Sequence, residues 1–167
     1  MGEDLTAKDT LIHRETQLST NVFWSTAYSD LRTENLITYS PNKTVTPIVT
    51  YGGVLTDRSS VADTANALEG EGYRVVAGIN GDFYNMTNGA PSGALVMEGV
   101  EYHGIANENF FGILKDGTPI IGGAEEWNAN ESNIQEAVGA SIVLVKDGKV
   151  AVAEDSNYYN SRVSRTC

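Results

Sequence analysis

Two side chains capable of acid–base or binding chemistry follow an apolar run in "VAGINGDFYN", residues 76–85. Asn80 and Asp82 are two positions apart, so they lie on the same face if the chain stays extended, and Gly81 between them allows a bend or a close backbone approach. This arrangement would aim an amide and a carboxylate into one pocket. The same residues are also typical of a simple turn after a strand, and this stretch alone leaves both interpretations open.

Further candidates occur later in the chain. His103, in "EYHGIANENFFG", suits a general acid or a substrate contact, or else a surface or packing role. Arg162 and Arg165, in "YYNSRVSRTC", bring positive charge to a chain that has little of it. The planar donor fork of arginine suits a phosphate or a carboxylate, although these two side chains could instead balance an acidic surface.

The elements around these residues must position them. Residues 74–79, "RVVAGI", carry no charge after Arg74 and predict a central strand buried on both faces, whose end is a place where loops gather function. "NGAPSGALVMEG", residues 88–99, predicts a glycine- and proline-containing loop that leads into a hairpin. That loop could belong to the site or be an ordinary connection.

Strands and one clear helix are predicted before this region. The stretches 17–28, 34–40 and 45–53 are rich in β-branched and aromatic residues, with a turn signal "SPNK" before the last, and predict antiparallel strands. Within 57–73 the period changes to that of a helix. Its expected features are a Ser59 or Ser60 cap, Asp63 in the first turn, a face made by Val61, Ala65 and Leu68, and an end at Gly70 or Gly72.

Three short turns predict hairpins in the second half of the chain: residues 97–100 ("MEGV"), 115–118 ("KDGT") and 146–149 ("KDGK"). Each places an acidic residue and glycine between apolar runs, as tight hairpins prefer. Residues 125–141 are less regular, with a short helix expected at 132–138. The predicted fold class is α+β, a mixed, largely antiparallel sheet with hairpins packed against one or two helices.

Composition excludes several classes of protein. The 167 residues carry 22 acidic and 11 basic side chains, a formal net charge of −11 that would repel a phosphate backbone, so no nucleic-acid partner is expected. No run of about 18 apolar residues exists, so no membrane span is expected. Residues 1–16 are mostly polar and predict an extension or linker remnant before a single domain over 17–167. The polar start also lacks the pattern of a signal peptide.

No metal or cofactor is predicted. The two histidines, His13 and His103, are far apart in sequence, and no calcium loop of the D-x-D-x-D-G type occurs. A structural calcium held by loop carboxylates and carbonyls stays open. The single cysteine, Cys167, allows no internal disulfide.

The order of these motifs resembles the phosphodiester glycosidase domain family, which includes bacterial exopolysaccharide-associated proteins and the mammalian mannose 6-phosphate uncovering enzyme. The likeness runs from about residue 17 to residue 167, through "VAGINGDFY", the Pro-x-Gly loop, "FFGILKDGTPIIG", "AVGASIVLVKDGK" and "RVSRT". Asn80, Gly81, Asp82 and Phe83 match the family's Asn-Gly-Asp-Phe-Phe signature, and Tyr84 stands where phenylalanine is more common.

Two later matches follow. Pro91 and Gly93 match the family's next loop, in which Ser92 stands where asparagine is frequent. Arg165 and Thr166 match an Arg-Thr pair that opens the family's next strand. Because an aspartate-glycine-arginine motif follows that strand in the family, the resemblance predicts that this chain is C-terminally truncated and holds roughly the first half or two-thirds of the domain.

The resemblance implies hydrolysis of a sugar joined through its anomeric carbon to a phosphodiester, such as an N-acetylglucosamine-1-phosphodiester. We expect the catalytic residues to be Asp82, Asn80 and Arg165. The expected substrate-binding residues are Gly81, Tyr84, Gly93, His103, Arg162 and Thr166. A bacterial secreted or cell-envelope location is expected from the family, although this chain carries no signal or anchor.

Two alternatives stay open. The chain could be a non-catalytic cell-envelope module that binds a glycan, or a partial domain that is active only when its C-terminal remainder completes it.

Overall fold

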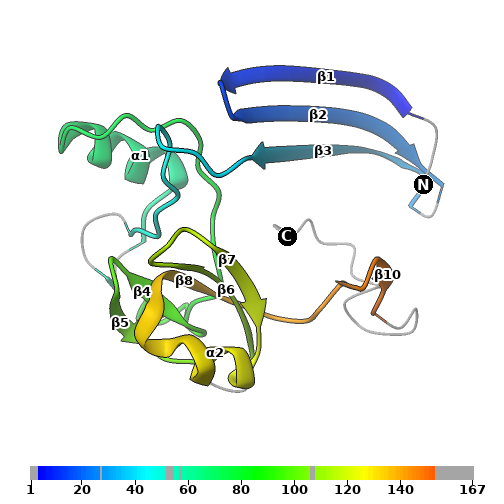
Figure 1. Cartoon of the computed structure of the whole chain (residues 1–167). Helices are drawn as coiled ribbons and strands as arrows, with labels where there is room; N and C mark the ends of the chain where they lie inside the picture. The colour runs from blue at the N-terminus through cyan, green and yellow to red at the C-terminus, as the bar shows by residue number, and fades with distance from the viewer. Residues whose placement is uncertain (1–3, 27, 52–54, 57, 106–107, 153–167) are drawn as a thin grey trace. The chain divides into compact units, whose positions relative to one another are not determined.

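The computed structural model describes residues 4–26, 28–51, 55–56, 58–105 and 108–152 (Figure 1). These residues contain ten strands, two α-helices and one short 3₁₀ helix, and the strands form sheets of three, five and two strands in which all pairing is antiparallel. The predicted α+β class with a largely antiparallel sheet is confirmed. The chain divides into two compact units, residues 1–46 with 74–78 and residues 47–73 with 79–167.

The first unit contains a meander of three long strands in the order β1-β2-β3 (Figure 1): β1 (Asp4–His13), β2 (Thr16–Ser25) and β3 (Asp30–Tyr39). Side chains also pair across the strands, as where Ser19 Oγ donates to Asp9 Oδ1 at 2.6 Å and Asn21 Nδ2 donates to Glu34 Oε2 at 2.9 Å. The strands predicted at 17–28 and 34–40 correspond to β2 and β3. The expected polar extension instead contains β1, because pairing with β2 supplies the hydrogen bonds that its polar sequence did not signal. The boundary at residue 16 stays a prediction.

Two predicted strands are wrong. Residues 45–51 of the stretch 45–53 form no strand; residues 52 and 53 lie outside the described residues. Residues 74–79 also form no strand, and the central, doubly buried strand expected there is not observed: Val75 and Val76 are half-buried, but the side chain of Ile79 is 62% exposed. An apolar run becomes a strand only when a neighbour pairs with its backbone, and no described strand does so here.

The predicted helix is present as α1 (Val61–Gly70) in the second unit. Ser60 is its N-cap, with a side-chain oxygen that accepts from the N–H of Asp63 at 3.1 Å, which satisfies one of the free donors of the first turn. On the predicted face Ala65 and Leu68 are half-buried, whereas Val61 is 40% exposed. Neither helix in the described part of the chain is long and apolar enough to cross a membrane.

A five-stranded sheet in the order β5-β4-β8-β6-β7 forms the centre of the second unit. Its strands are β4 (Leu95–Met97), β5 (Val100–His103), β6 (Asn109–Leu114), β7 (Pro119–Gly122) and β8 (Ile134–Ala140). The three predicted hairpins are confirmed: β4–β5, β6–β7 and the separate pair β9 (Val145–Lys146) with β10 (Lys149–Val150). Their turns use positive φ at Glu98 and Gly99, at Gly117, and at Asp147 and Gly148. The local turn residues therefore set these pairings, as the sequence predicts.

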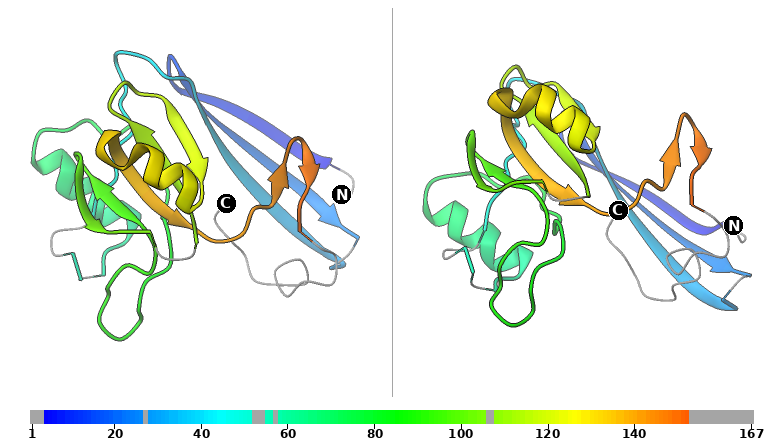
Figure 2. Two further views of the ribbon diagram at one scale, coloured as in Figure 1. Left: turned by 60° about the horizontal axis from the view of Figure 1, so that its bottom comes forward. Right: turned by 90° about the horizontal axis from the view of Figure 1, so that it is seen from below.

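The core of this unit forms between the sheet and α2 (Ala124–Asn130), which lies against one face of the sheet in both views of Figure 2. The ring of Phe110 on β6 is fully buried and meets the ring of Trp127 on α2 edge to face, with centroids 5.0 Å apart. The helix predicted at 132–138 is wrong. A 3₁₀ turn (Glu131–Asn133) follows α2, and residues 134–140 form β8, because pairing with both β4 and β6 outweighs the helical tendency of Gln135 to Val138.

A buried carboxylate on the central strand of this sheet binds two neighbouring segments. Glu136 on β8 is only 4% exposed, and it accepts from the N–H of Val49 at 3.0 Å and from the N–H of Glu98 at 3.2 Å. Burial raises the pKa of the Glu136 carboxyl above its ordinary value of 4.5, the two N–H donors oppose that rise, and the nearby Glu98 adds to it. One side chain thus ties the 47–51 segment and the β4–β5 turn to the central strand.

The raised pKa of Glu136 predicts a pH dependence of stability. The folded chain holds this proton more tightly than the unfolded chain, so the stabilising contribution is fully present below the ordinary pKa and is lost as the pH rises through the raised value. We therefore expect the unfolding free energy of the wild type to fall relative to that of Glu136→Gln as the pH rises above the ordinary pKa of 4.5. Urea unfolding of both proteins as a function of pH measures the difference. A difference that stays constant with pH would contradict the assignment.

Candidate functional site

The carboxylate of Asp82 packs tightly against the five-stranded sheet. Asp82 is half-buried as a residue, but its Oδ2 atom is buried and has no hydrogen-bond partner. A Cβ atom placed on Gly93 or on Gly139 would overlap this oxygen, and a Cβ on Gly139 would also lie 2.7 Å from the Cα of Gly93. Only glycine at both positions leaves room for the carboxylate.

Gly81 allows the same close approach one residue earlier. A Cβ on Gly81 would lie 2.7 Å from Cγ2 of Val138 on β8. The glycine that the sequence predicts to permit close backbone approach therefore does so, against the strand that also carries Gly139. A larger residue at position 81 would push Asp82 away from the sheet.

The loop of residues 83–92 returns the chain to Asp82. Tyr84 and Pro91 form an isolated antiparallel bridge, and the N–H of Ser92 donates to the carbonyl oxygen of Phe83 at 3.0 Å. The N–H of Asn85 donates to the carbonyl of Ala90 at 2.8 Å. These contacts close the loop, so the chain re-enters the sheet through Gly93 beside the carboxylate. The loop predicted to lead into a hairpin thus helps to build the candidate site.

His103, at the end of β5, contacts the same glycine. Its Nδ1 lies 2.8 Å from the carbonyl oxygen of Gly93. Since a carbonyl oxygen only accepts, Nδ1 is the protonated nitrogen in this contact, which leaves Nε2 as the acceptor of the neutral ring. Asp82 and His103 therefore both touch Gly93, and the structure brings together three residues that the sequence predicts separately.

The other predicted site residues differ in how far the structure describes them. Asn80 is exposed, as is Tyr84, whose side chain is 45% exposed. Arg162, Arg165 and Thr166 lie outside the described residues.

Two residues that touch this region were missed by the sequence interpretation. Gly139 carries no functional group, and its signal is the isolated glycine within a strand, which often marks close backbone approach. Arg58 lies before α1; its Nη2 donates to the carbonyl of Met86, and its guanidinium carbon lies 5.9 Å from the centre of the Tyr84 ring. No chemical motif surrounds Arg58 in the sequence.

A family model described as phosphodiester glycosidase matches residues 73–167, more than half of the chain and including both Asp82 and Gly139. The chain belongs to the phosphodiester glycosidase family. A search of curated proteins gave no match. The matched span confirms the family that the motif order predicted, and glycosidase chemistry with a carbohydrate substrate follows at the level of the family.

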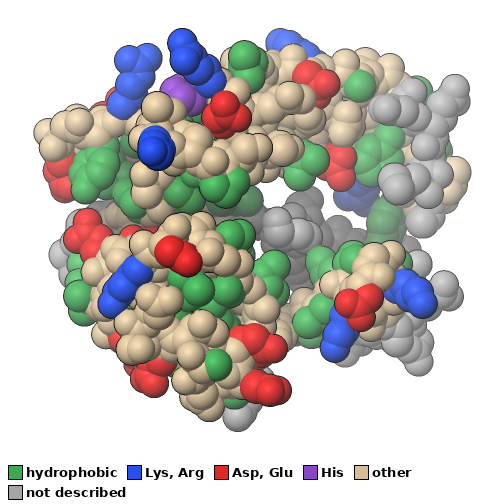
Figure 3. All heavy atoms as spheres, in the orientation of Figure 1, with side chains coloured by type: hydrophobic (Ala, Val, Ile, Leu, Met, Phe, Trp, Pro, Cys, Tyr) green, Lys and Arg blue, Asp and Glu red, His purple; other side chains and the backbone are tan. Residues whose placement is uncertain are grey.

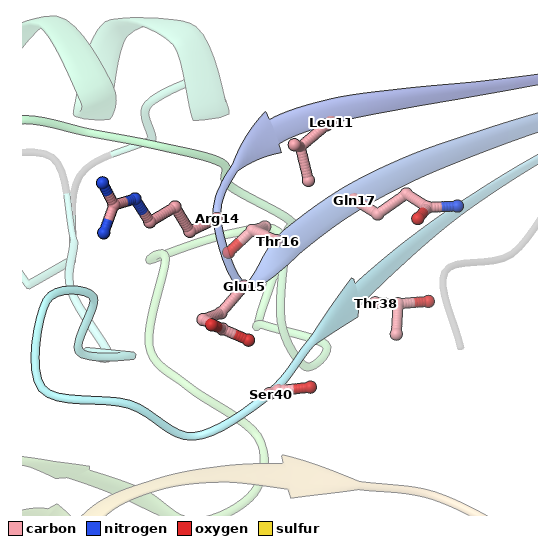
Figure 4. Close-up of a pocket in the computed structure, with 7 residues that line it drawn as sticks. All are labelled: Leu11, Arg14, Glu15, Thr16, Gln17, Thr38 and Ser40. Atoms are coloured by element: carbon pink, nitrogen blue, oxygen red, sulfur yellow. The ribbon is translucent and has the colours of Figure 1, made fainter.

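A separate hollow of about 150 Å³ lies in the first unit, at the end of the β1–β2 hairpin (Figure 4). The lining side chains diverge in Figure 4, with Arg14 and Gln17 pointing to opposite sides. No residue predicted to belong to the glycosidase site lines it. Its lining consists of Leu11, Arg14, Glu15, Thr16, Gln17, Thr38 and Ser40.

Two further observations concern the charge of the chain and its possible metal ligands. Acidic side chains are scattered among other types over the face shown in Figure 3, in keeping with the net charge of −11. Across the described ranges, no three His, Cys, Asp or Glu side chains gather closely enough to hold a metal ion.

Proposed function

We propose that this chain hydrolyses a sugar-1-phosphodiester linkage, of the N-acetylglucosamine-1-phosphodiester type, and releases the sugar from a phosphate leaving group. The observation that carries the proposal is the placement of Asp82. A carboxylate oxygen is held without a donor between two glycines, one of which also contacts His103, within the span that matches the family. A buried polar atom without a partner is uncommon and often marks a functional site.

The chemistry suits these groups. The bond from the anomeric carbon to the phosphate oxygen breaks, and a carboxylate stabilises the positive charge that develops on the sugar ring. The oxygen of a water molecule forms the new bond to this carbon, and its proton passes to solvent. A phosphate monoester, whose second pKa is about 6, leaves without full protonation, so a strong general acid is not required. Asp82 faces the anomeric carbon, and Asn80 and His103 orient the sugar.

The phosphate needs positive charge, and in this proposal Arg165 supplies it with help from Arg162 and the neighbouring Thr166. A secreted or cell-envelope location in a bacterium, with an exopolysaccharide as the source of the linkage, is part of the proposal because such glycans carry sugar phosphodiesters outside the cell.

A second candidate is a module that binds a glycan without cleaving it. The exposed aromatic side chains favour it: Phe83 is 59% exposed and Tyr84 is 45% exposed, both directly after Asp82. Aromatic rings of this kind stack on sugar faces as well as on other apolar surfaces.

One experiment separates the two candidates. The 167-residue chain is incubated with an N-acetylglucosamine-1-phosphodiester, and free sugar is measured over time. We expect release of the sugar, with much slower release from the methyl glycoside of the same sugar, because an alkoxide leaves far less readily than a phosphate. Saturable binding of the phosphodiester without any release would reject the hydrolase and favour the binding module.

A further inference from the structure

The exposed side chain of Arg58 is held against the loop that follows Asp82. Its Nη2 donates to the carbonyl of Met86, and its guanidinium lies over the ring of Tyr84, 5.9 Å from the centroid. Both partners belong to the 83–92 loop. Contact with an aromatic face and a backbone acceptor restricts a side chain that would otherwise be flexible.

The segment before α1 also approaches the same loop closely at a second point. Gly89 adopts φ +71°, and a Cβ at this position would overlap the carbonyl oxygen of Thr56. Two asparagines stiffen the loop itself: Asn85 Oδ1 accepts from the N–H of Thr87 at 2.8 Å, and Asn88 Oδ1 accepts from the N–H of Ala90 at 3.1 Å. Arg58 and the neighbouring Thr56 therefore both lie close to this loop.

The other basic side chains described in this unit lie in other segments. Lys115 Nζ donates to the carbonyl of Ser132 at 2.8 Å, at the β6–β7 turn. Lys146 and Lys149 belong to the β9–β10 hairpin. Among the described residues of the unit, Arg58 is thus the cation that contacts the loop next to Asp82.

We propose that Arg58 binds the phosphate of the substrate, and that the exposed ring of Tyr84 lies beside it. This assignment rests on the proposed function, which requires a phosphate next to the sugar carbon whose developing charge Asp82 stabilises. Tyr84 is two residues from Asp82, about 7 Å along an extended chain, which is the scale of a sugar phosphate. Arg58 lies outside the span that matches the family, residues 73–167.

The substrate then has a defined direction in the site. Its sugar lies toward Asp82, Gly93 and His103, and its phosphate lies toward the 83–92 loop. A guanidinium keeps its charge at every working pH and offers paired N–H donors to phosphate oxygens, which a lysine does not match. Phosphate esters are therefore expected to bind better than the uncharged sugar.

The test measures binding, so that it does not depend on turnover. Calorimetry gives the Kd of N-acetylglucosamine 1-phosphate and of N-acetylglucosamine for the wild type, Arg58→Gln and Arg58→Lys. We expect Arg58→Gln to weaken binding of the sugar phosphate roughly tenfold or more, with Arg58→Lys in between, and to leave binding of the free sugar within about twofold. Lys115→Gln removes one positive charge from the same unit and is expected to change neither Kd.

Each result is decisive for Arg58. Equal weakening of both ligands would mean that Arg58 only holds the loop, and would overturn the assignment. So would a wild type that binds the sugar phosphate no more tightly than the sugar. If Arg58→Gln weakens only the sugar phosphate while the wild type releases no sugar from a phosphodiester, the proposed hydrolase is rejected and phosphate binding by Arg58 is still supported. Thermal unfolding confirms that each variant is folded.

Discussion

Replacing Asp82 by asparagine is expected to lower kcat for sugar release roughly 10²- to 10⁴-fold, the range that one positioned acid or base contributes. Asparagine has nearly the shape of aspartate, so the contacts with Gly93 and Gly139 remain, but the negative charge that stabilises the sugar cation is lost. Initial rates of sugar release from an N-acetylglucosamine-1-phosphodiester give kcat and KM for both proteins.

The Asp82→Asn variant is expected to be at least as stable as the wild type, although its kcat is lower. Asp82 Oδ2 is buried without a donor, and a neutral amide costs less to bury than an ionised oxygen. The melting temperature of Asp82→Asn should therefore equal or exceed that of the wild type, a pattern common when strained site residues are replaced.

Asp116→Asn is the matched control. Hydrogen bonding from Thr118, including an N–H donated to Asp116 Oδ1 at 2.9 Å, holds the pKa of that carboxyl below its ordinary value. The negative charge of Asp116 therefore stabilises the β6–β7 turn. The control should lose stability and keep its turnover. If Asp82→Asn retains kcat within about tenfold of the wild type, Asp82 is not the catalytic carboxylate.

The parts of the fold that the sequence predicts are those that short-range chemistry determines. Ser60 caps α1, and acidic-glycine pairs such as Glu98-Gly99 make the hairpin turns, because a cap or a turn involves only a few neighbouring residues. The failures depend on distant partners. Residues 74–79 have the composition of a buried strand, but no strand in the described part of the chain pairs with them. Residues 134–140 pair with two strands that the local sequence does not reveal.

The candidate site shows the same division. Asp82, Gly93 and His103 are predicted from residue type and motif order, and the structure brings them together through Gly93. Gly139 lies near Asp82 because β8 pairs with β4, and Arg58 lies near it because it contacts the 83–92 loop. Both residues are distant from Asp82 in sequence, so the sequence alone does not indicate them. Residue type identifies groups that react, whereas the residues that make space for those groups emerge only from packing.

Gly139→Ala is expected to lower kcat by roughly 10²-fold, because a small displacement of a catalytic group is enough for a loss of this size. The new Cβ would overlap Asp82 Oδ2 and lie 2.7 Å from the Cα of Gly93. The two strands cannot separate easily, since the N–H of Gly139 donates to the carbonyl of Ala94 at 2.8 Å. The carboxylate must therefore move, and crowding should lower the unfolding free energy by about 1–3 kcal/mol.

Destabilisation alone would not explain a loss of kcat measured well below the melting temperature, and a double-mutant cycle tests the point further. If Gly139 acts by positioning Asp82, adding Gly139→Ala to Asp82→Asn should lower kcat by less than about twofold, because the catalytic charge is already gone. An equal loss in both backgrounds would show that Gly139 acts independently of Asp82. Gly70→Ala serves as the control, since a Cβ there meets nothing within 4 Å, and it should leave kcat unchanged. A strong dependence on Asp82 would identify the glycine pair as the feature that sets the position of the carboxylate.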